Sequence, residues 1–202
     1  MTSLSEAKTL GGIGSILVLF TAVPNIGWLL GISGFVLILL AIKNISQVVN
    51  DKKIYSSMLT AVTLAIGAIA VGTVTVIGAV YHVLGMGSFV GSKFILASSI
   101  PVGDWIGLAA AVVVGVLAVE AFLVASAVFL RRSYNSIASK LNVKMFEKAG
   151  LLYLIGAATV IIGVGFILIL VAEILLAISF FSIPEQQRAL DASQTQTVAP
   201  TS

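Results

Sequence analysis

Long apolar stretches separated by short polar segments are the main feature of this chain. They cover about residues 10–23, 27–46, 56–84, 105–130, 149–162 and 166–183. A transmembrane helix needs about 20 predominantly apolar residues to cross the hydrocarbon core of a bilayer. The pattern therefore predicts an all-α fold, a polytopic bundle of about six transmembrane helices in one domain over residues 10–183. Residues 1–9 form a short polar segment before it.

The first two and the last two stretches are each divided by a turn signal. Val23-Pro24-Asn25-Ile26-Gly27 divides the first pair, and Gly163-Val164-Gly165 divides the last pair. As one helix, the run from Ala149 to Ile183 would measure roughly 50 Å, well beyond the roughly 30 Å of hydrocarbon. We therefore expect it to turn back at the glycines. Both hairpins are short for full spans, so partial penetration stays open beside the full crossing that we favour.

Two of the stretches resemble each other. Gly34–Ala41 reads GFVLILLA and Gly165–Ala172 reads GFILILVA, and each follows a turn and a short apolar helix. A repeat of the first and last hairpins explains this match. So does coincidence, because the composition of both helices is so restricted.

Composition places the chain in a membrane. Hydrophobic residues make up 59% and charged residues 9%, with a mean hydropathy of +1.15, against about 25% charged residues in soluble proteins. Cysteine is absent, which excludes disulfides and thiolate-ligated clusters. The single histidine, His82, excludes a bis-histidine haem within one chain. We expect no cofactor and no metal site.

Basic residues sort to one side of the predicted bilayer. With six spans and the N-terminus in the cytoplasm, ten basic residues fall inside and Lys93 falls outside. The ten are Lys8, Lys43, Lys52, Lys53, Arg131, Arg132, Lys140, Lys144, Lys148 and Arg188. The positive-inside rule thus predicts a multi-pass protein of the cell membrane with both termini cytoplasmic. The polar tail, residues 184–202, is predicted to be disordered.

Two acidic residues interrupt the apolar runs. Glu120 and Glu173 each lie 11 residues before the predicted cytoplasmic boundary of their helix, at Arg131 and Pro184. That places both near the middle of the bilayer, where a charge costs at least about 2.5–3.5 kcal/mol. They are the candidate ion or proton site. The alternative is that each is a protonated acid that hydrogen-bonds to Ser, Thr or backbone and ties helices together.

Small residues recur at helical spacing. Gly107, Ala111 and Gly115 follow one another every four residues, and Gly163 and Gly165 lie at the last turn. Such faces let helix backbones approach closely, within one chain or between chains. They predict tight packing, and with it a homo-oligomer or membership of a larger membrane complex.

A basic segment connects the fourth and fifth stretches. Tyr134, Ile137, Ala138, Leu141 and Met145 follow helical spacing, and Arg131, Arg132, Lys140 and Lys144 are available to the other face. An amphipathic helix on the membrane surface would bury the apolar stripe and contact anionic lipid head groups. An ordinary connector that continues the fourth helix explains the pattern equally well. Because the bilayer already explains these charges, we expect no nucleic-acid binding.

No catalytic motif is present in a suitable context: GxSxG, Walker A, HExxH and the dinucleotide glycine fingerprint are all lacking. We therefore assign no catalytic residue and expect no enzyme. The leading hypothesis is a structural, accessory or scaffolding membrane protein that packs through small-residue faces. The alternative is a small transporter or channel that uses Glu120 and Glu173, and an intramembrane enzyme is a distant third.

Three segments resemble a known family. They are Lys8–Leu17 (KTLGGIGSIL), Gly34–Ser46 (GFVLILLAIKNIS) and the long run from Arg131 to Pro184. Together they look like an archaeal family of small multi-spanning membrane proteins known only as a domain of unknown function. The resemblance covers most of residues 7–184, although the middle two spans match only in character. It implies an archaeal cell membrane and brings no activity, substrate or site residue.

Overall fold

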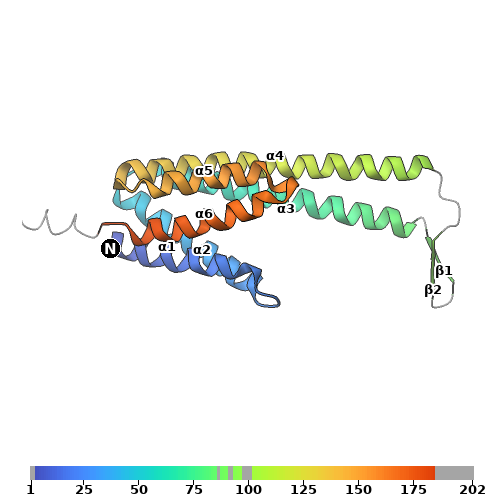
Figure 1. The fold of residues 1–202 in the computed structure, drawn as a ribbon, viewed down its shortest axis with the longest axis horizontal. Helices are drawn as coiled ribbons and strands as arrows, with labels where there is room; N and C mark the ends of the chain where they lie inside the picture. Colours follow the sequence, from blue (N-terminus) through green and yellow to red (C-terminus); the bar gives the residue numbers. More distant parts are fainter. Residues whose placement is uncertain (1–2, 86, 91–92, 97–101, 185–202) are drawn as a thin grey trace, which may run out of the picture.

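The computed structural model describes residues 3–85, 87–90, 93–96 and 102–184. Six helices lie at the six predicted stretches (Figure 1). They are α1 (Leu4–Leu19), α2 (Gly27–Val48), α3 (Lys52–Gly85), α4 (Val102–Leu141), α5 (Met145–Ala158) and α6 (Val164–Phe181), with 3-10 turns η1 (Phe20–Ala22) and η2 (Val160–Ile162). The predicted all-α class is confirmed. The predicted disordered tail lies outside the described residues from residue 185 onward.

A short antiparallel hairpin between α3 and α4 departs from the predicted all-helical pattern. It consists of β1 (Gly87–Val90) and β2 (Lys93–Leu96), with Ser88 opposite Ile95. From the sequence, residues 87–96 belong to the connection between the apolar stretches 56–84 and 105–130. Figure 1 shows the hairpin at the end of the molecule far from the N-terminus.

The helices form three antiparallel hairpins arranged as a closed ring. Each helix packs against its neighbours in the chain, and α1 packs against α6 to close the ring. Four of the turns contain a residue with a positive φ, in the left-handed region of backbone space. Such a residue commonly terminates a helix. These residues are Asn25, Asn50, Asn142 and Gly163, with φ values of 68°, 51°, 56° and 82°.

The three hairpins differ greatly in length. Helices α3 and α4 have 34 and 40 residues, whereas α1 and α5 have 16 and 14. Figure 1 shows the α3–α4 hairpin projecting well beyond the other two. The projecting part exposes large apolar side chains, including Val74 at 71% and Val114 at 66%. Four helices, namely α2, α3, α4 and α6, are long and apolar enough to cross a membrane, which indicates membrane association.

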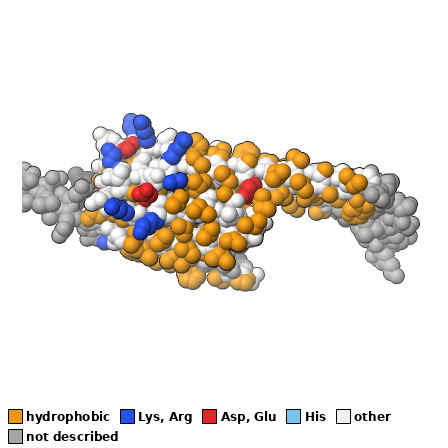
Figure 2. All heavy atoms as spheres, turned by 45° about the horizontal axis from the view of Figure 1, so that its top comes forward, with side chains coloured by type: hydrophobic (Ala, Val, Ile, Leu, Met, Phe, Trp, Pro, Cys, Tyr) orange, Lys and Arg blue, Asp and Glu red, His pale blue; other side chains and the backbone are white. Residues whose placement is uncertain are grey.

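Basic side chains gather at the end of the bundle opposite the β-hairpin. Figure 2 shows this charged end, where acidic side chains lie among the basic ones, next to a mostly apolar surface that an acidic side chain interrupts. Its basic residues lie near the start of α1, α3 and α5 and toward the end of α2 and α4. They are Lys8, Lys43, Lys52, Lys53, Arg131, Arg132, Lys140, Lys144 and Lys148. Lys93 lies in β2, at the opposite end. The charge sorting behind the predicted cytoplasmic orientation is therefore present in three dimensions.

The charged end also contains the best-packed core. Ile42, Ile45, Ile54 and Ile137 are each 0% exposed there. Nearby, the Phe146 ring meets the Phe180 ring edge-on, with centroids 5.1 Å apart.

The predicted apolar stripe of the basic segment lies inside this core. Tyr134, Ile137, Ala138 and Leu141 are between 0% and 8% exposed, whereas Met145 is 39% exposed. Helix α4 continues without a break to Leu141. The connector interpretation is thus correct, and the stripe packs against protein rather than lipid head groups.

Glycines set the crossing points within the two short hairpins. A Cβ added to Gly34 would lie 2.5 Å from the Gly14 carbonyl oxygen, and one added to Gly14 would lie 2.7 Å from the Gly34 carbonyl oxygen. In the last hairpin, Gly156 and Gly165 approach each other's backbone in the same way. Only glycine permits such contact between backbones.

The predicted packing residues divide into two groups. Gly115 packs against the Thr75 side chain and Gly165 against Gly156, as expected for packing residues. Ala111 is exposed, and nothing lies within 4 Å of a Cβ added to Gly107 or Gly163. Among the described residues, therefore, Gly107 and Ala111 are not at a close helix contact, and a packing role for them stays a prediction. Gly163 serves the turn instead, through its positive φ.

Replacing Gly34 by valine should destabilise the fold. Its side chain would push α1 from α2, and overpacking of this kind lowers the free energy of unfolding by about 1–3 kcal/mol. The matched control is Gly78→Val, because a Cβ at Gly78 meets nothing within 4 Å. Thermal unfolding in detergent should show a lower Tm for Gly34→Val only. Equal effects of the two substitutions would contradict the assigned crossing.

Candidate functional site

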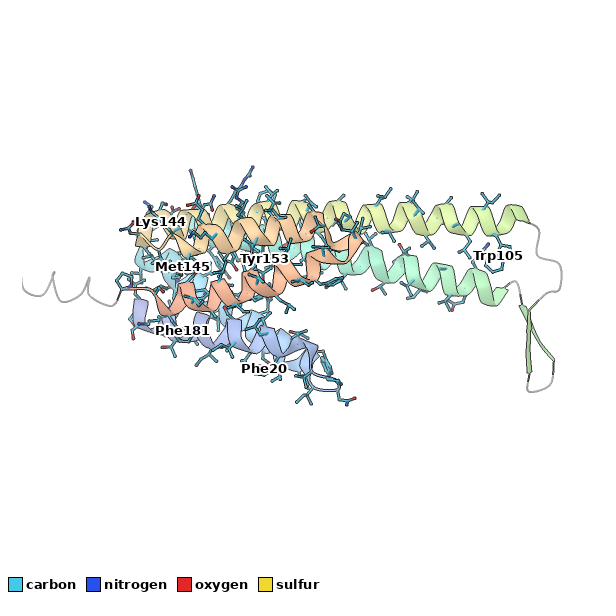
Figure 3. All side chains as sticks on the ribbon, viewed as in Figure 1. Phe20, Trp105, Lys144, Met145, Tyr153 and Phe181 are labelled. Carbon is cyan, nitrogen blue, oxygen red and sulfur yellow. The ribbon has the colours of Figure 1, made fainter. Side chains whose placement is uncertain are left out.

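A cavity of about 220 Å³ lies where five of the six helices converge. That volume holds several water molecules at about 30 Å³ each. Its lining residues are Phe35 and Ile38 of α2, Met58, Ala61, Val62 and Ala65 of α3, Leu123, Ser126, Ala127, Leu130 and Tyr134 of α4, Tyr153 and Ala157 of α5, and Ile169 and Glu173 of α6. In Figure 3, Tyr153 lies within the packed half of the bundle, away from Trp105 near the far end of α4.

Glu173 is the acidic residue in the lining of this cavity. Its side chain is 6% exposed, and its Oε2 atom is buried without a hydrogen-bond partner among the described residues. No lysine, arginine or histidine is among the described residues that line the cavity. A buried carboxylate without a partner is strongly unfavourable. The group is therefore stable there only when it is protonated or when a cation lies beside it.

The apparent repeat shows how unusual this position is. When Gly34 is matched with Gly165, Ala41 matches Ala172 and Ile45 matches Leu176, and all six residues are buried. In the same register Glu173 corresponds to Ile42, which is 0% exposed in the core. An apolar residue thus occupies the matching buried position of α2. The carboxyl of α6 is not required by helix packing alone.

Aromatic and hydroxyl groups complete the lining. The rings of Tyr134 and Tyr153 are 6.5 Å apart between centroids, at 54° to each other. The Ser126 hydroxyl donates a hydrogen bond of 2.8 Å to the Ala61 carbonyl oxygen, which joins α4 to α3. Aromatic ring faces attract cations. The cavity therefore combines one carboxyl with two tyrosine side chains, a set of groups suited to a positive ligand.

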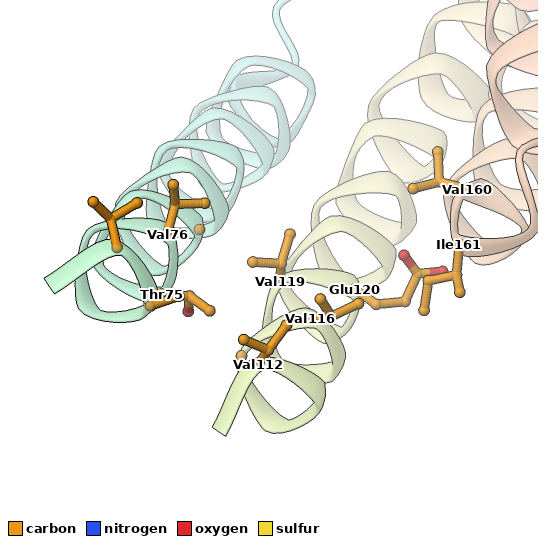
Figure 4. Close-up of a pocket in the computed structure, with 12 residues that line it drawn as sticks. Thr75, Val76, Val112, Val116, Val119, Glu120, Val160 and Ile161 are labelled. Atoms are coloured by element: carbon orange, nitrogen blue, oxygen red, sulfur yellow. The ribbon is translucent and has the colours of Figure 1, made fainter. Parts of the chain in front are cut away.

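Glu120 lies in a different place. It is half-buried and lines a groove of about 380 Å³ between α3, α4 and the α5–α6 turn. Figure 4 shows its carboxyl directed toward Val160 and Ile161, away from Thr75. No residue of this groove also lines the cavity around Glu173.

The structure thus does not bring the two predicted acids into one site. The sequence placed them at equal depth by counting to Arg131 and Pro184. Helix α4, however, runs inside the bundle to Leu141, ten residues past Arg131. Arg131 therefore does not mark the end of α4. Glu120 lies further from the charged end than Glu173, because the helix continues past the residue from which its depth was counted.

The predicted lipid-contact residues lie at the charged end. Arg132, Lys140 and Lys144 are exposed, and the Arg132 guanidinium stacks over the Phe129 ring at 5.1 Å. Arg131 is half-buried, and its Nε atom has no hydrogen-bond partner among the described residues. Contact of these residues with lipid remains a prediction.

Sequence reasoning missed most of the cavity lining. Phe35, Met58 and Tyr153 lie in apolar runs where nothing distinguished them, and for Tyr134 a membrane-surface stripe and a connector that continues the fourth helix were equally open. The available signal was weak: Tyr153 is one of four tyrosines in the chain and the one within the last two apolar stretches. In the described part of the chain, no group of three or more His, Cys, Asp or Glu residues is placed to hold a metal ion.

Comparison with known proteins agrees with the resemblance noted from the sequence. Residues 30–174, which include Phe35, Tyr134 and Glu173, match the family described as "Protein of unknown function (DUF996)". The chain is also 36% identical to the uncharacterized protein MJ1644 of the archaeon Methanocaldococcus jannaschii over 186 residues, which is 92% of this chain and 96% of that protein. No solved structure matches the chain. The chain therefore belongs to the archaeal family of unknown function DUF996.

Proposed function

We propose that this protein is a small membrane transporter or channel that binds a cation in the central cavity beside Glu173. The observation that carries the proposal is the 6% exposed carboxyl with an unpartnered oxygen, which lines a cavity formed by five helices. Ionisable residues inside membrane helix bundles commonly mark ion or substrate pathways. In this proposal the charged end faces the cytoplasm and the apolar surface lies in the cell membrane.

Binding at Glu173 alone replaces the two-carboxylate site expected from the sequence. Glu120 has no part in it, because its groove is separate and consists mainly of valine side chains. The proposal includes no catalytic step.

A scaffolding or accessory role is the second candidate. It is supported by the projecting α3–α4 hairpin, where a groove of about 350 Å³ is lined partly by the small residues Gly78, Ala79, Gly107 and Ala111. Nothing lies within 4 Å of a Cβ added to Gly78 or Gly107. Such faces accept a helix of another subunit, either a second copy of the chain or a different membrane protein.

Substitution of Glu173 by glutamine should abolish cation binding. The amide keeps the shape and removes the charge, so we expect at least a tenfold loss of affinity for whichever cation stabilises the wild-type protein. The measurement is the shift in Tm of protein in lipid nanodiscs on titration with potassium, sodium and methylammonium ions. Glu120→Gln is the control and should bind like wild type. Equal binding by wild type and Glu173→Gln would remove the proposed site.

If Glu173 is present for ligand binding rather than for packing, replacing it by an apolar residue should stabilise the fold. Glu173→Met keeps the side-chain volume and removes the unpartnered carboxyl, so without added cation the free energy of unfolding should rise by about 1–3 kcal/mol. The control Glu120→Met should change it less, because Glu120 is only half-buried. Denaturant or thermal unfolding in detergent measures both. A large loss of stability in Glu173→Met would show that the carboxyl holds the helices together instead.

The scaffolding candidate has its own test. Native mass spectrometry of the protein extracted gently from its own membrane should then show a homo-oligomer or a reproducible heterologous partner. Gly107→Leu should dissociate that complex without lowering the Tm of the isolated chain, because the glycine has no neighbour within it. Persistence of the complex in the variant would exclude this hairpin as the interface.

A further inference from the structure

The central cavity is closed toward the charged end. Ile38, Met58 and Tyr134 line it on that side and are each 1–2% exposed. Beyond them lies the core with Ile45 and Ile137, both at 0% exposure. A ligand therefore does not reach Glu173 from the charged end in this conformation.

Away from the charged end the lining residues are less buried. We place the opening of the cavity there, between α2 and α3, which pack less closely against each other than the other neighbouring helices do. Phe35 is 36% exposed, and Ala65 and Leu123 are half-buried. On each helix these residues lie further from the charged end than the buried lining residue: Phe35 beyond Ile38 on α2, Ala65 beyond Met58 on α3, and Leu123 beyond Tyr134 on α4. We call the opening bounded by Phe35, Val62 and Ala65 the mouth.

The mouth lies in an apolar surface. Along their helices, Phe35 is about 12 Å from Lys43, and Ala65 is about 18 Å from Lys53. Next to it, Ile32 is 59% and Ile66 is 61% exposed. Figure 1 shows the α1–α2 hairpin diverging from the α3–α4 hairpin on this side. In a bilayer that covers these side chains, the mouth faces hydrocarbon rather than water.

The lining chemistry selects among cations. Ca²⁺ takes six to eight oxygen ligands, commonly several of them from carboxylates and carbonyls. This lining offers one carboxyl and the hydroxyls of Ser126, Tyr134 and Tyr153. An alkylammonium group needs only a carboxylate and neighbouring aromatic rings, and Glu173, Tyr134 and Tyr153 all line the cavity. A phosphate-bearing lipid fits poorly, because no described basic residue lines the cavity.

We infer that the ligand is a cationic amphiphile that enters from the bilayer, with its ammonium group beside Glu173 and its alkyl chain passing through the mouth between α2 and α3. This inference rests on the proposed cation site and adds the class of ligand and the route. It explains why a carboxyl without a counter-charge lies next to an opening lined by apolar side chains.

The test uses two probes on the full-length protein in lipid nanodiscs. Tetramethylammonium and dodecyltrimethylammonium share a head group and differ in the alkyl chain. We expect dodecyltrimethylammonium to bind at least tenfold more tightly, and Glu173→Gln to lose that binding. Empty nanodiscs and the Gln variant measure partition into lipid. If both probes bind with equal affinity through Glu173, the cation site stands and entry from the bilayer is overturned. If neither probe binds in a Glu173-dependent way, the inferred ligand class is overturned, and the titration with potassium, sodium and methylammonium then decides separately whether the cation site stands.

A second variant tests the mouth itself. Ala65→Phe places a ring where the alkyl chain would pass and should weaken dodecyltrimethylammonium binding at least tenfold. The matched control is Ala70→Phe, on the same helix but exposed and outside the cavity lining. Unchanged affinity in a folded Ala65→Phe protein would overturn the assigned route. The comparison of the two probes on wild type does not depend on this variant.

Discussion

Unequal hairpin lengths govern the architecture of this protein. The α3–α4 hairpin is more than twice as long as α1 or α5, so the three hairpins pack side by side only at the charged end. There the ring closes, and large side chains such as Phe146 and Phe180 fill its centre. Further along, the short hairpins end and α3 and α4 continue together. The cavity lies within the packed region, where residues of five helices line it.

The position of the buried Glu173 carboxyl follows from this geometry. Glu173 lies just beyond the closed core, at the level where the helices begin to separate, and its counterpart in the matching helix is Ile42. A carboxyl deeper in the core would have no room for a ligand, and one further out would lie on the exposed surface. Its position between the two allows a cation to neutralise it. The separate location of Glu120, beside the α5–α6 turn, gives that residue no comparable enclosure.

The two functional candidates use different halves of the molecule. Cation binding depends on the packed half, where five helices line one cavity. Association with another subunit depends on the projecting half, where small residues such as Gly78 and Gly107 face open space. The two roles are compatible in one protein, because no residue of the projecting groove lines the cavity.

The sequence by itself determined the helical class, the places of the six helices, the turn at Gly163 and the gathering of basic residues at one end. These properties follow from local composition: apolar runs form helices in a nonpolar solvent, and glycine or asparagine ends them. Only the tertiary structure decided which acid is enclosed, because that depends on where α4 ends and how each helix is rotated. Counting residues to the predicted boundaries placed Glu120 and Glu173 alike, and the helical spacing of Tyr134 left a lipid-facing stripe and a buried connector equally open. Contacts with Phe146 and the other helices, which no run of residues encodes locally, put that tyrosine inside the bundle beside one carboxyl and far from the other.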